Sequence, residues 1–403
     1  KCIVCPYCKQ RFPLINHQWL EYSKNKHIGF NIIINSKKNF DIKIIKNFSD
    51  SEGNKFTQKG GKAICISCKN SISRELLTRI ISKEKDQEMI AIQTKNNGIR
   101  NYIVPTIKDK IRFLAASSLL KLKIKEFTEL NLIPNEPIKP SHRKENSLWH
   151  YGITQWSHFF NDRQLLFLIT LLKNMKDITC SIKNIEEQKI ILLYLSLMLS
   201  KAMNYTNAGT LWDKTTGAPK HALTIRRPSN VFNYPEINPF ATVGGSTMNM
   251  LNNICQAINF SRIHKPTCDV SLKSVLNLEG EEKYDLIITD PPYGDDVQYG
   301  ELSEYFYVWV YRALKDHYPE LPPRIPLDED FCESWGRFGD KKLASDFFAK
   351  GLKKSFVSMN DKLKDDGLLV VFFAHSSTET WNQLLESIRE AKFKVVSSYS
   401  IHT

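Results

Sequence analysis

The sequence predicts an α/β protein in which a small cysteine-bearing ribbon and a helical region precede a parallel sheet. Three observations lead to this prediction. Two Cys-x-x-Cys pairs stand near the start, leucine-rich segments with helical periodicity fill the middle, and short apolar strands alternate with helices in the last third. Strands that alternate with helices indicate a parallel sheet with crossover connections.

The composition is that of a globular protein. Of 403 residues, 42% are hydrophobic and 25% are charged, which is close to the average for soluble domains. No apolar run reaches membrane-spanning length, and the first residues do not resemble a signal peptide. We therefore expect a cytoplasmic protein of two or three domains with no membrane partner.

Positive charge is concentrated in the first third of the chain. The net charge is +13; residues 1–150 hold 28 Lys+Arg and 13 Asp+Glu, whereas residues 151–403 hold 28 and 30. A basic module joined to a nearly neutral one suggests a polyanionic partner, DNA or RNA, held by phosphate contacts. The alternative is a solvated lysine-rich surface.

Nine cysteines without a secretory signal argue for thiols or metal ligands rather than disulfides. Four of them form the knuckles Cys5-Pro6-Tyr7-Cys8 and Cys65-Ile66-Ser67-Cys68. Each knuckle can place two thiolates on one metal ion, so together they predict a closed, structural zinc site. A redox dithiol is the alternative, and Cys2 could replace Cys5 or Cys8.

Residues 1–82 are expected to form a zinc ribbon, with strands between Ile28 and Asn47. Residues 83–148 form a basic connecting region that contains a helix at about 110–125. The isolated cysteines are expected to be buried small side chains: Cys180, Cys255, Cys268 and Cys332.

Residues 149–260 have a helical character and are a candidate target-recognition region. Asn161 can cap a helix over 162–175, and residues 185–203 form a second helix that is apolar over most of its circumference in its later turns, where we expect it to be buried. Ser246 can cap a third helix that ends near residue 259.

Residues 261–403 carry the α/β pattern. The apolar run 284–289 predicts a strand buried on both faces. The other elements, in order, are a strand or strand–turn at 271–278, helices at 302–314, 347–362 and 378–391, a turn at 364–367, and strands at 368–373 and 394–399. Ligands bind at the carboxyl ends of parallel strands, where Asp290 and His375 are expected to lie.

The most informative motif comes directly after the run 284–289 and reads Asp290-Pro291-Pro292-Tyr293-Gly294. Two prolines remove two backbone donors and fix φ, so that carbonyl groups remain free to accept an amino group. Asp290 adds a second acceptor, and the Tyr293 ring can stack on a base taken out of a duplex. This arrangement is used by enzymes that methylate exocyclic amino groups of bases. The alternative is a tight turn that ends a strand.

Further segments accompany the motif and the knuckles: Phe12-Pro13-Leu14, Tyr151-Gly152 to Trp156, Arg163-Gln164-Leu165-Leu166, Asn238-Pro239-Phe240, Tyr299, Leu302-Ser303, Tyr305 to Trp309, Phe373-Ala374-His375 and Thr380-Trp381. With these residues the chain resembles the zinc-ribbon-containing adenine-specific DNA methyltransferases, a family with an uncharacterised domain that occurs in anti-phage gene clusters. The resemblance covers most of the chain. Its most specific part is the stretch after the motif.

The resemblance implies a Rossmann-like, S-adenosylmethionine-dependent catalytic fold. By position, Asp290, Pro291, Pro292 and Tyr293 would hold the target amino group and its base. Asp269 stands where such enzymes often place an acid near the adenosine of the cofactor, and Asp290 and Tyr293 would also contact the cofactor.

The sequence departs from the family in one respect. The family's glycine-rich Phe-x-Gly-x-Gly cofactor loop precedes the zinc ribbon, and this sequence contains no such loop. We therefore expect the chain to hold the C-terminal part of the catalytic fold, with residues 1–260 as a zinc-ribbon and helical insert. The cofactor loop would lie upstream of Lys1 or in a second polypeptide, and the last strands could lie beyond Thr403.

The expected function is N6-adenine methylation of DNA, in restriction-modification or anti-phage defence. The motif binds any planar amino group, so an N4-cytosine or RNA-base methyltransferase is an alternative. A non-catalytic nucleic-acid-binding subunit of a split methyltransferase is a second alternative, which the missing glycine loop favours.

Overall fold

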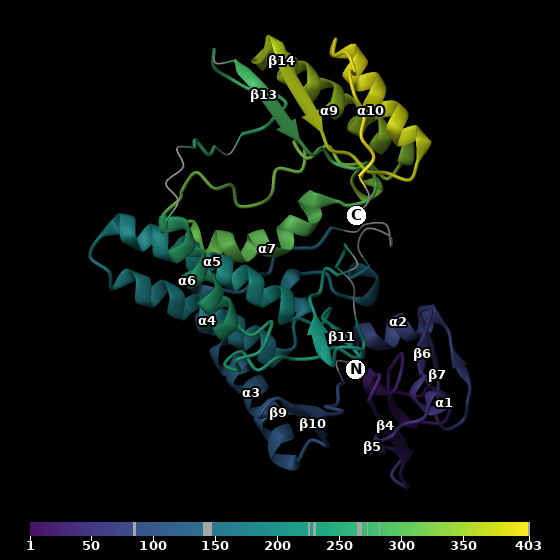
Figure 1. Cartoon of the computed structure of the whole chain (residues 1–403). Coiled ribbons are helices and arrows are strands. Elements are labelled where there is room, and N and C mark those ends of the chain that lie inside the picture. The colour runs from purple at the N-terminus through teal and green to yellow at the C-terminus, as the bar shows by residue number, and fades with distance from the viewer. Residues whose placement is uncertain are drawn as a thin grey trace. The chain divides into compact units, whose positions relative to one another are not determined.

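The computed structural model describes residues 1–83, 86–139, 147–224, 226–228, 231–263, 268–271, 273–281 and 283–401. The chain divides into two compact units. The first contains Lys1–Lys139, Asn146–Phe260 and Val308–Leu321, and the second contains Ser261–Tyr307 and Pro322–Thr403. Both helices and small sheets are present, so the protein is of mixed α/β class (Figure 1).

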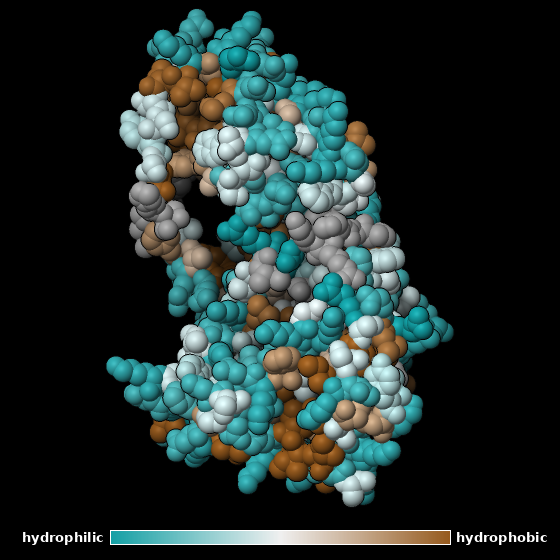
Figure 2. Space-filling model, turned by 90° about the vertical axis from the view of Figure 1, so that its right-hand side faces the viewer, coloured by the Kyte–Doolittle hydropathy of each residue, from teal (hydrophilic) through white to brown (hydrophobic). Residues whose placement is uncertain are grey.

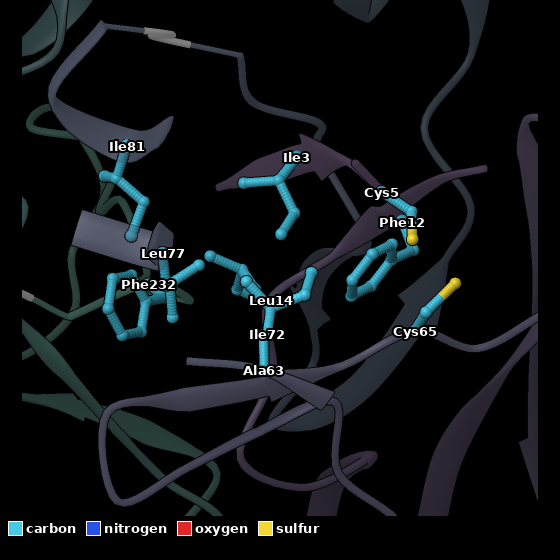
Figure 3. Packing of buried hydrophobic residues seen from close by; sticks show 10 residues of the cluster. All are labelled: Ile3, Cys5, Phe12, Leu14, Ala63, Cys65, Ile72, Leu77, Ile81 and Phe232. Carbon is cyan, nitrogen blue, oxygen red and sulfur yellow. The ribbon is translucent and has the colours of Figure 1, made fainter. Parts of the chain in front are cut away.

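The first unit begins with two short sheets that carry the knuckles. Strands β1 (Cys2–Val4) and β2 (Arg11–Pro13) pair antiparallel, as do β6 (Gln58–Lys59), β7 (Lys62–Ile64) and β8 (Ser71–Ile72). Helix α2 (Arg74–Lys83) packs against them. One buried core joins these elements (Figure 3): Ile3, Cys5, Phe12, Leu14, Ala63, Cys65, Ile72, Leu77, Ile81 and Phe232.

A three-stranded antiparallel sheet is inserted between the knuckles, as the alternating sequence predicted. It consists of β3 (Trp19–Ser23), β4 (Lys26–Ile34) and β5 (Phe40–Lys46), and the short helix α1 (Asp50–Gly53) comes after it. The Trp19 ring is buried in this insert and contacts Phe48 edge-on. The insert thus has an aromatic core of its own.

A hairpin and a long helix come next. Strands β9 (Ile92–Asn96) and β10 (Ile99–Ile103) are joined at Asn97 and Gly98, whose φ values of 47° and 80° match a two-residue hairpin turn. Helix α3 (Ile107–Glu129) includes the predicted helix at 110–125 and starts earlier, because Thr106 and Asp109 form a capping box.

The helical region has the predicted caps. Asn161 caps α4 (Asp162–Cys180), and the Ser246 hydroxyl accepts a hydrogen bond from the N–H of Asn249 at the start of α6 (Thr247–Ile263). The other elements of the region are α5 (Ile185–Tyr205), the 3₁₀ helices η1 (Trp149–Tyr151) and η2 (Trp156–Phe159), and the hairpin of β11 (Leu211–Asp213) and β12 (Ala218–Lys220). The later turns of α7 (Tyr299–Leu314) also belong to this unit, where Trp309 packs against Phe160.

The second unit is built on two parallel strands, β13 (Tyr284–Thr289) and β14 (Leu363–Val371). Helices α9 (Lys341–Lys362) and α10 (Thr378–Glu390) lie behind the strands in Figure 1, and the short helix α8 (Trp335–Phe338) precedes α9. Ile287 and Leu369 pack on a buried core formed by α9, α10 and residues next to the helices: Phe331, Phe348, Leu352, Phe356, Met359, Leu384 and Ala391.

Three predictions about this unit are wrong, and a fourth is correct only for its turn. The strand at 284–289 is not buried on both faces, because Tyr284, Leu286 and Ile288 are 49%, 48% and 61% exposed. Residues 394–399 pair with no described strand, and residues 364–367 belong to β14 instead of forming a turn before it. The described residues of 271–278 contain the turn but no strand. The run 284–289 pairs with β14 and packs one face on the core of the unit, but among the described residues nothing covers its other face and nothing pairs with 394–399.

The isolated cysteines also differ from expectation. Cys332 is buried, whereas Cys180, Cys255 and Cys268 are exposed. No helix among the described residues is long and apolar enough to cross a membrane.

Candidate functional site

The motif Asp290-Pro291-Pro292-Tyr293 lies where β13 ends. Thr289, the last residue of β13, pairs with Val371, the last residue of β14, and the N–H of Phe372 donates to the Thr289 carbonyl at 2.9 Å. The two strands are parallel, so the loops after them leave from the same edge. The motif and the segment 372–377 are therefore neighbours.

Two aromatic contacts connect these loops. The Tyr293 ring meets the Phe373 ring at a centroid distance of 5.3 Å, and Phe373 meets Trp381 at 5.0 Å, both edge-on. The Trp381 indole N–H donates to the His375 carbonyl at 3.0 Å. A continuous aromatic wall thus runs from the motif to the first turn of α10.

Within the motif, the Tyr293 hydroxyl donates to Asp290 Oδ1 at 2.5 Å. The bond to a carboxylate stabilises the neutral phenol and raises the pKa of Tyr293 to about 12. Among the described residues, nothing donates a hydrogen bond to Asp290 Oδ2, so this oxygen can accept one from a ligand.

Gly294 is required by close packing at the end of the motif. Its φ is +59°, and a Cβ there would lie 3.0 Å from Thr380 Cγ2. His375 Nδ1 accepts from the N–H of Ser377 at 3.0 Å, and its Nε2 lies 3.4 Å from Asp295 Oδ1. His375 thus brings its own loop next to the loop that carries Asp295.

A third segment, residues 333–335, also holds the motif loop in place and was not identified from the sequence. The N–H of Glu333 donates to the Gly294 carbonyl at 3.0 Å, and the Gln298 amide bonds the carbonyls of Asp295 and Glu333 at 3.2 and 3.4 Å. Burial raises the pKa of the Glu333 carboxyl, which accepts from the Trp335 indole at 3.3 Å. Residues 318–334 have no periodic pattern that would have predicted this contact.

Asp269 is not part of this arrangement. It is exposed, lies in a segment without regular secondary structure, and has no hydrogen bond or ion pair to any described residue. Its role at a cofactor remains a prediction.

The four knuckle cysteines come together in the first unit. Their sulfurs all lie within 4.8 Å of one another, with Cys5 to Cys68 at 3.8 Å and Cys8 to Cys65 at 3.6 Å. Four thiolates at about 2.3 Å from a tetrahedral metal ion would be about 3.8 Å apart. The geometry is therefore that of a site that could hold a zinc ion.

The two knuckles have the same backbone geometry. The backbone carbonyls of Cys5 and Cys65 each accept a hydrogen bond from the N–H of the residue four positions later. These residues are Lys9 and Lys69, whose φ values are 65° and 60°. The backbone N–H of Gln10 lowers the pKa of the Cys8 thiol to about 6, and burial raises the pKa of the Cys65 thiol to about 12. In Figure 3 the sulfurs of Cys5 and Cys65 lie at one end of the buried core.

Cys2 is outside this cluster. It is buried on β1 opposite Pro13, and burial raises the pKa of its thiol to about 11. The geometry therefore favours Cys5 and Cys8, and not Cys2, as the ligands of the first knuckle.

Comparison of the chain with protein-family models, with curated proteins and with solved structures gives no match. A function for this chain must therefore be inferred from the geometry of its two sites.

Replacing Asp290 by Asn should lower the pKa of Tyr293 from about 12 toward the ordinary 10, because the carboxylate that disfavours the tyrosinate is gone. Nuclear magnetic resonance with ¹³C-labelled tyrosine would monitor the titration, with Tyr293→Phe identifying the signal. Between pH 9 and 11 the signal should shift in the variant and stay constant in the parent. An equal titration in both proteins would contradict the Tyr293–Asp290 hydrogen bond.

Proposed function

We propose that this chain is the substrate-binding part of an S-adenosylmethionine-dependent methyltransferase that acts on the N6 amino group of adenine in DNA. The observation that carries the proposal is the position of the motif. Asp290-Pro291-Pro292-Tyr293 lies at the carboxyl end of a parallel strand, beside an aromatic wall, where α/β proteins bind their ligands.

The residues of the motif suit the chemistry. Asp290 Oδ2 and the Pro291 carbonyl would accept the two hydrogens of the amino group, which localises the nitrogen lone pair. The Tyr293 ring, held edge-on by Phe373, offers a face for stacking on a flipped base. In this mechanism the chain supplies positioning and electrostatic stabilisation, and no covalent enzyme intermediate is needed.

S-Adenosylmethionine, when bound, supplies an electrophilic methyl group on a sulfonium. As the nitrogen–carbon bond forms, the carbon–sulfur bond breaks, and the amine loses one proton to solvent after the transfer. Asp290 therefore need not act as a strong base. The residue's task is to orient the amino group.

The sheet itself supports the idea that the cofactor half lies outside these 403 residues. Parallel sheets are normally covered on both faces, but one face of β13 and β14 is bare apolar surface in the described unit. The exposed side chains are Tyr284, Leu286, Ile288, Leu368 and Phe372. Figure 2 shows apolar surface gathered on the part of the molecule that holds these strands. We infer that a polypeptide with the glycine-rich cofactor loop covers this face, whether joined to this chain or separate.

DNA is the proposed partner of the basic first third of the chain, through phosphate contacts. The bare sheet face also favours the second candidate, a nucleic-acid-binding subunit that is not catalytic by itself. N4-cytosine and RNA bases remain alternative substrates, because Asp290 and Pro291 would accept any planar amino group.

We further propose that Cys5, Cys8, Cys65 and Cys68 hold one structural zinc ion. The two buried cysteines sit in the core of the unit, and two knuckles with four ligands leave no coordination position open for catalysis. Zinc would join two short sheets that share only a small core.

Asp290→Ala in the complete enzyme should reduce methyl incorporation into DNA to background, while DNA binding stays within about twofold, because the residue contacts the amino group and not the phosphates. Tritiated methyl transfer and a filter-binding assay measure the two quantities. Asp285→Ala is the matched control, since Asp285 lies at the other end of the same strand and pairs with Lys364. Retained methylation by Asp290→Ala would refute the assigned role.

The inferred cofactor half predicts that this chain alone gives no measurable heat with S-adenosylmethionine in calorimetry. It also predicts that Leu286→Lys changes the unfolding free energy of this chain by less than about 0.5 kcal/mol, as an exposed site should. In the complete enzyme the same substitution should abolish cofactor binding, because it buries a charge. Clear cofactor binding by the chain alone would contradict the inference.

The zinc proposal predicts about one zinc per chain in elemental analysis, since four thiolates complete one tetrahedral site. Cys65→Ser should lose the metal and lower the unfolding temperature of the first unit, because metal binding stabilises the folded state. Cys2→Ser, on the neighbouring strand but outside the cluster, should keep the metal. Equal zinc content in all three proteins would exclude this site.

A further inference from the structure

A second cluster of carboxylate and thiol groups lies in the second unit, next to the motif in sequence. Glu301 is in the first turn of α7, and Asp330 and Cys332 belong to the segment before α8; one ligand atom of each lies within 4.8 Å of the others. By composition the cluster resembles a metal site.

A guanidinium group already occupies it. Arg337 Nη2 lies 2.7 Å from Glu301 Oε2, 2.5 Å from Asp330 Oδ2 and 3.3 Å from Cys332 Sγ. The arginine side chain is only 10% exposed. The cluster therefore binds its own cation, and we assign it no metal.

Arg337 uses all five of its N–H donors. Nε and Nη2 form a bidentate pair with Glu301, at 2.6 and 2.7 Å, and Nη2 also donates to Asp330. Nη1 donates to the carbonyls of Leu327 and Asp330. A planar fork with five donors is specific to arginine, and lysine cannot reproduce it.

These bonds fix the start of α7 to the segment 327–332. Asp330 Oδ2 also accepts from the N–H of Gly300 at 2.8 Å, and a Cβ at Gly300 would lie 2.5 Å from that oxygen. We call the cluster of Arg337, Glu301, Asp330 and the Gly300 N–H the Arg337 clamp.

The clamp is connected to the loop 290–298 at two points. Tyr299 begins α7 directly after this loop, so the clamp fixes the loop's downstream end. Glu333, which lies between Asp330 and Arg337, donates its N–H to the Gly294 carbonyl. The upstream end is fixed by β13. The loop that carries Asp290 and Tyr293 is thus held between the sheet and the Arg337 clamp.

We propose that Arg337 is the positioning residue of the amino-group site: through Glu301 and Asp330 it sets the place of the loop 290–298. It touches no substrate and acts through the loop alone. The proposal rests on the proposed methyltransferase function only for its catalytic consequence. The structural consequence, a loop ordered by the clamp, stands independently.

The test is Arg337→Lys, which keeps the charge and removes the fork. Hydrogen exchange measured by mass spectrometry on the 403-residue chain should become at least tenfold faster in the peptide 290–298, while the peptides of the cysteine knuckles stay unchanged. In the complete enzyme kcat for methyl transfer should fall about 100-fold, the effect of a misplaced reacting group. KM for DNA should stay within about twofold.

Arg324→Lys is the matched control. Arg324 pairs with Glu304, one turn further along α7, and should change neither the exchange of the loop nor kcat. If Arg337→Lys does not fold, Glu301→Gln replaces it, because the amide keeps one acceptor and loses the charge.

The outcomes separate the two proposals. Unchanged exchange in 290–298 would overturn the clamp, and faster exchange with unchanged kcat would overturn its positioning role. A complete parental enzyme without methyl transfer would overturn the proposed function and leave the exchange result to decide on the clamp.

Discussion

The parallel pairing of β13 with β14 is the constraint on which the candidate site depends. Parallel strands release their loops at the same edge, and the pair Thr289–Val371 sets both loops at one level. Shifting this register by one residue would exchange the two faces of a strand and separate Tyr293 from Phe373. The aromatic wall, the His375 contact and the close approach at Gly294 all depend on that register.

The same pairing leaves one face of the two-stranded sheet uncovered in this unit. A parallel sheet buries apolar side chains on both faces, and here α9 and α10 cover one face while Leu286 and Ile288 remain exposed on the other. Two strands alone are too few for independent stability. The helices therefore supply the stability of this unit, and the bare face is available for the polypeptide that we infer to carry the cofactor loop.

Local signals were predictable from the sequence, and long-range ones were not. The caps at Asn161 and Ser246 and the two knuckles depend on neighbouring residues, so their patterns were sufficient. The apolar run 284–289 predicted a strand correctly but not its half-exposed state, because a run of apolar residues does not reveal what covers each face. Nothing in the sequence linked Arg337 to Glu301, since an ion pair across 36 positions has no periodicity.

In both sites a short motif is held by residues far away in the sequence, but the interactions differ. The knuckles are 57 positions apart and are brought together by a buried core, so that zinc would add strength to a geometry already formed. The motif loop is held instead by an arginine that is 10% exposed and bound to two carboxylates, a pairing whose disruption leaves uncompensated charge. Such a clamp has few alternative arrangements. In the proposed function the loop would place an amino group within hydrogen-bond distance of Asp290, a task that gains more from this rigidity than from additional apolar packing.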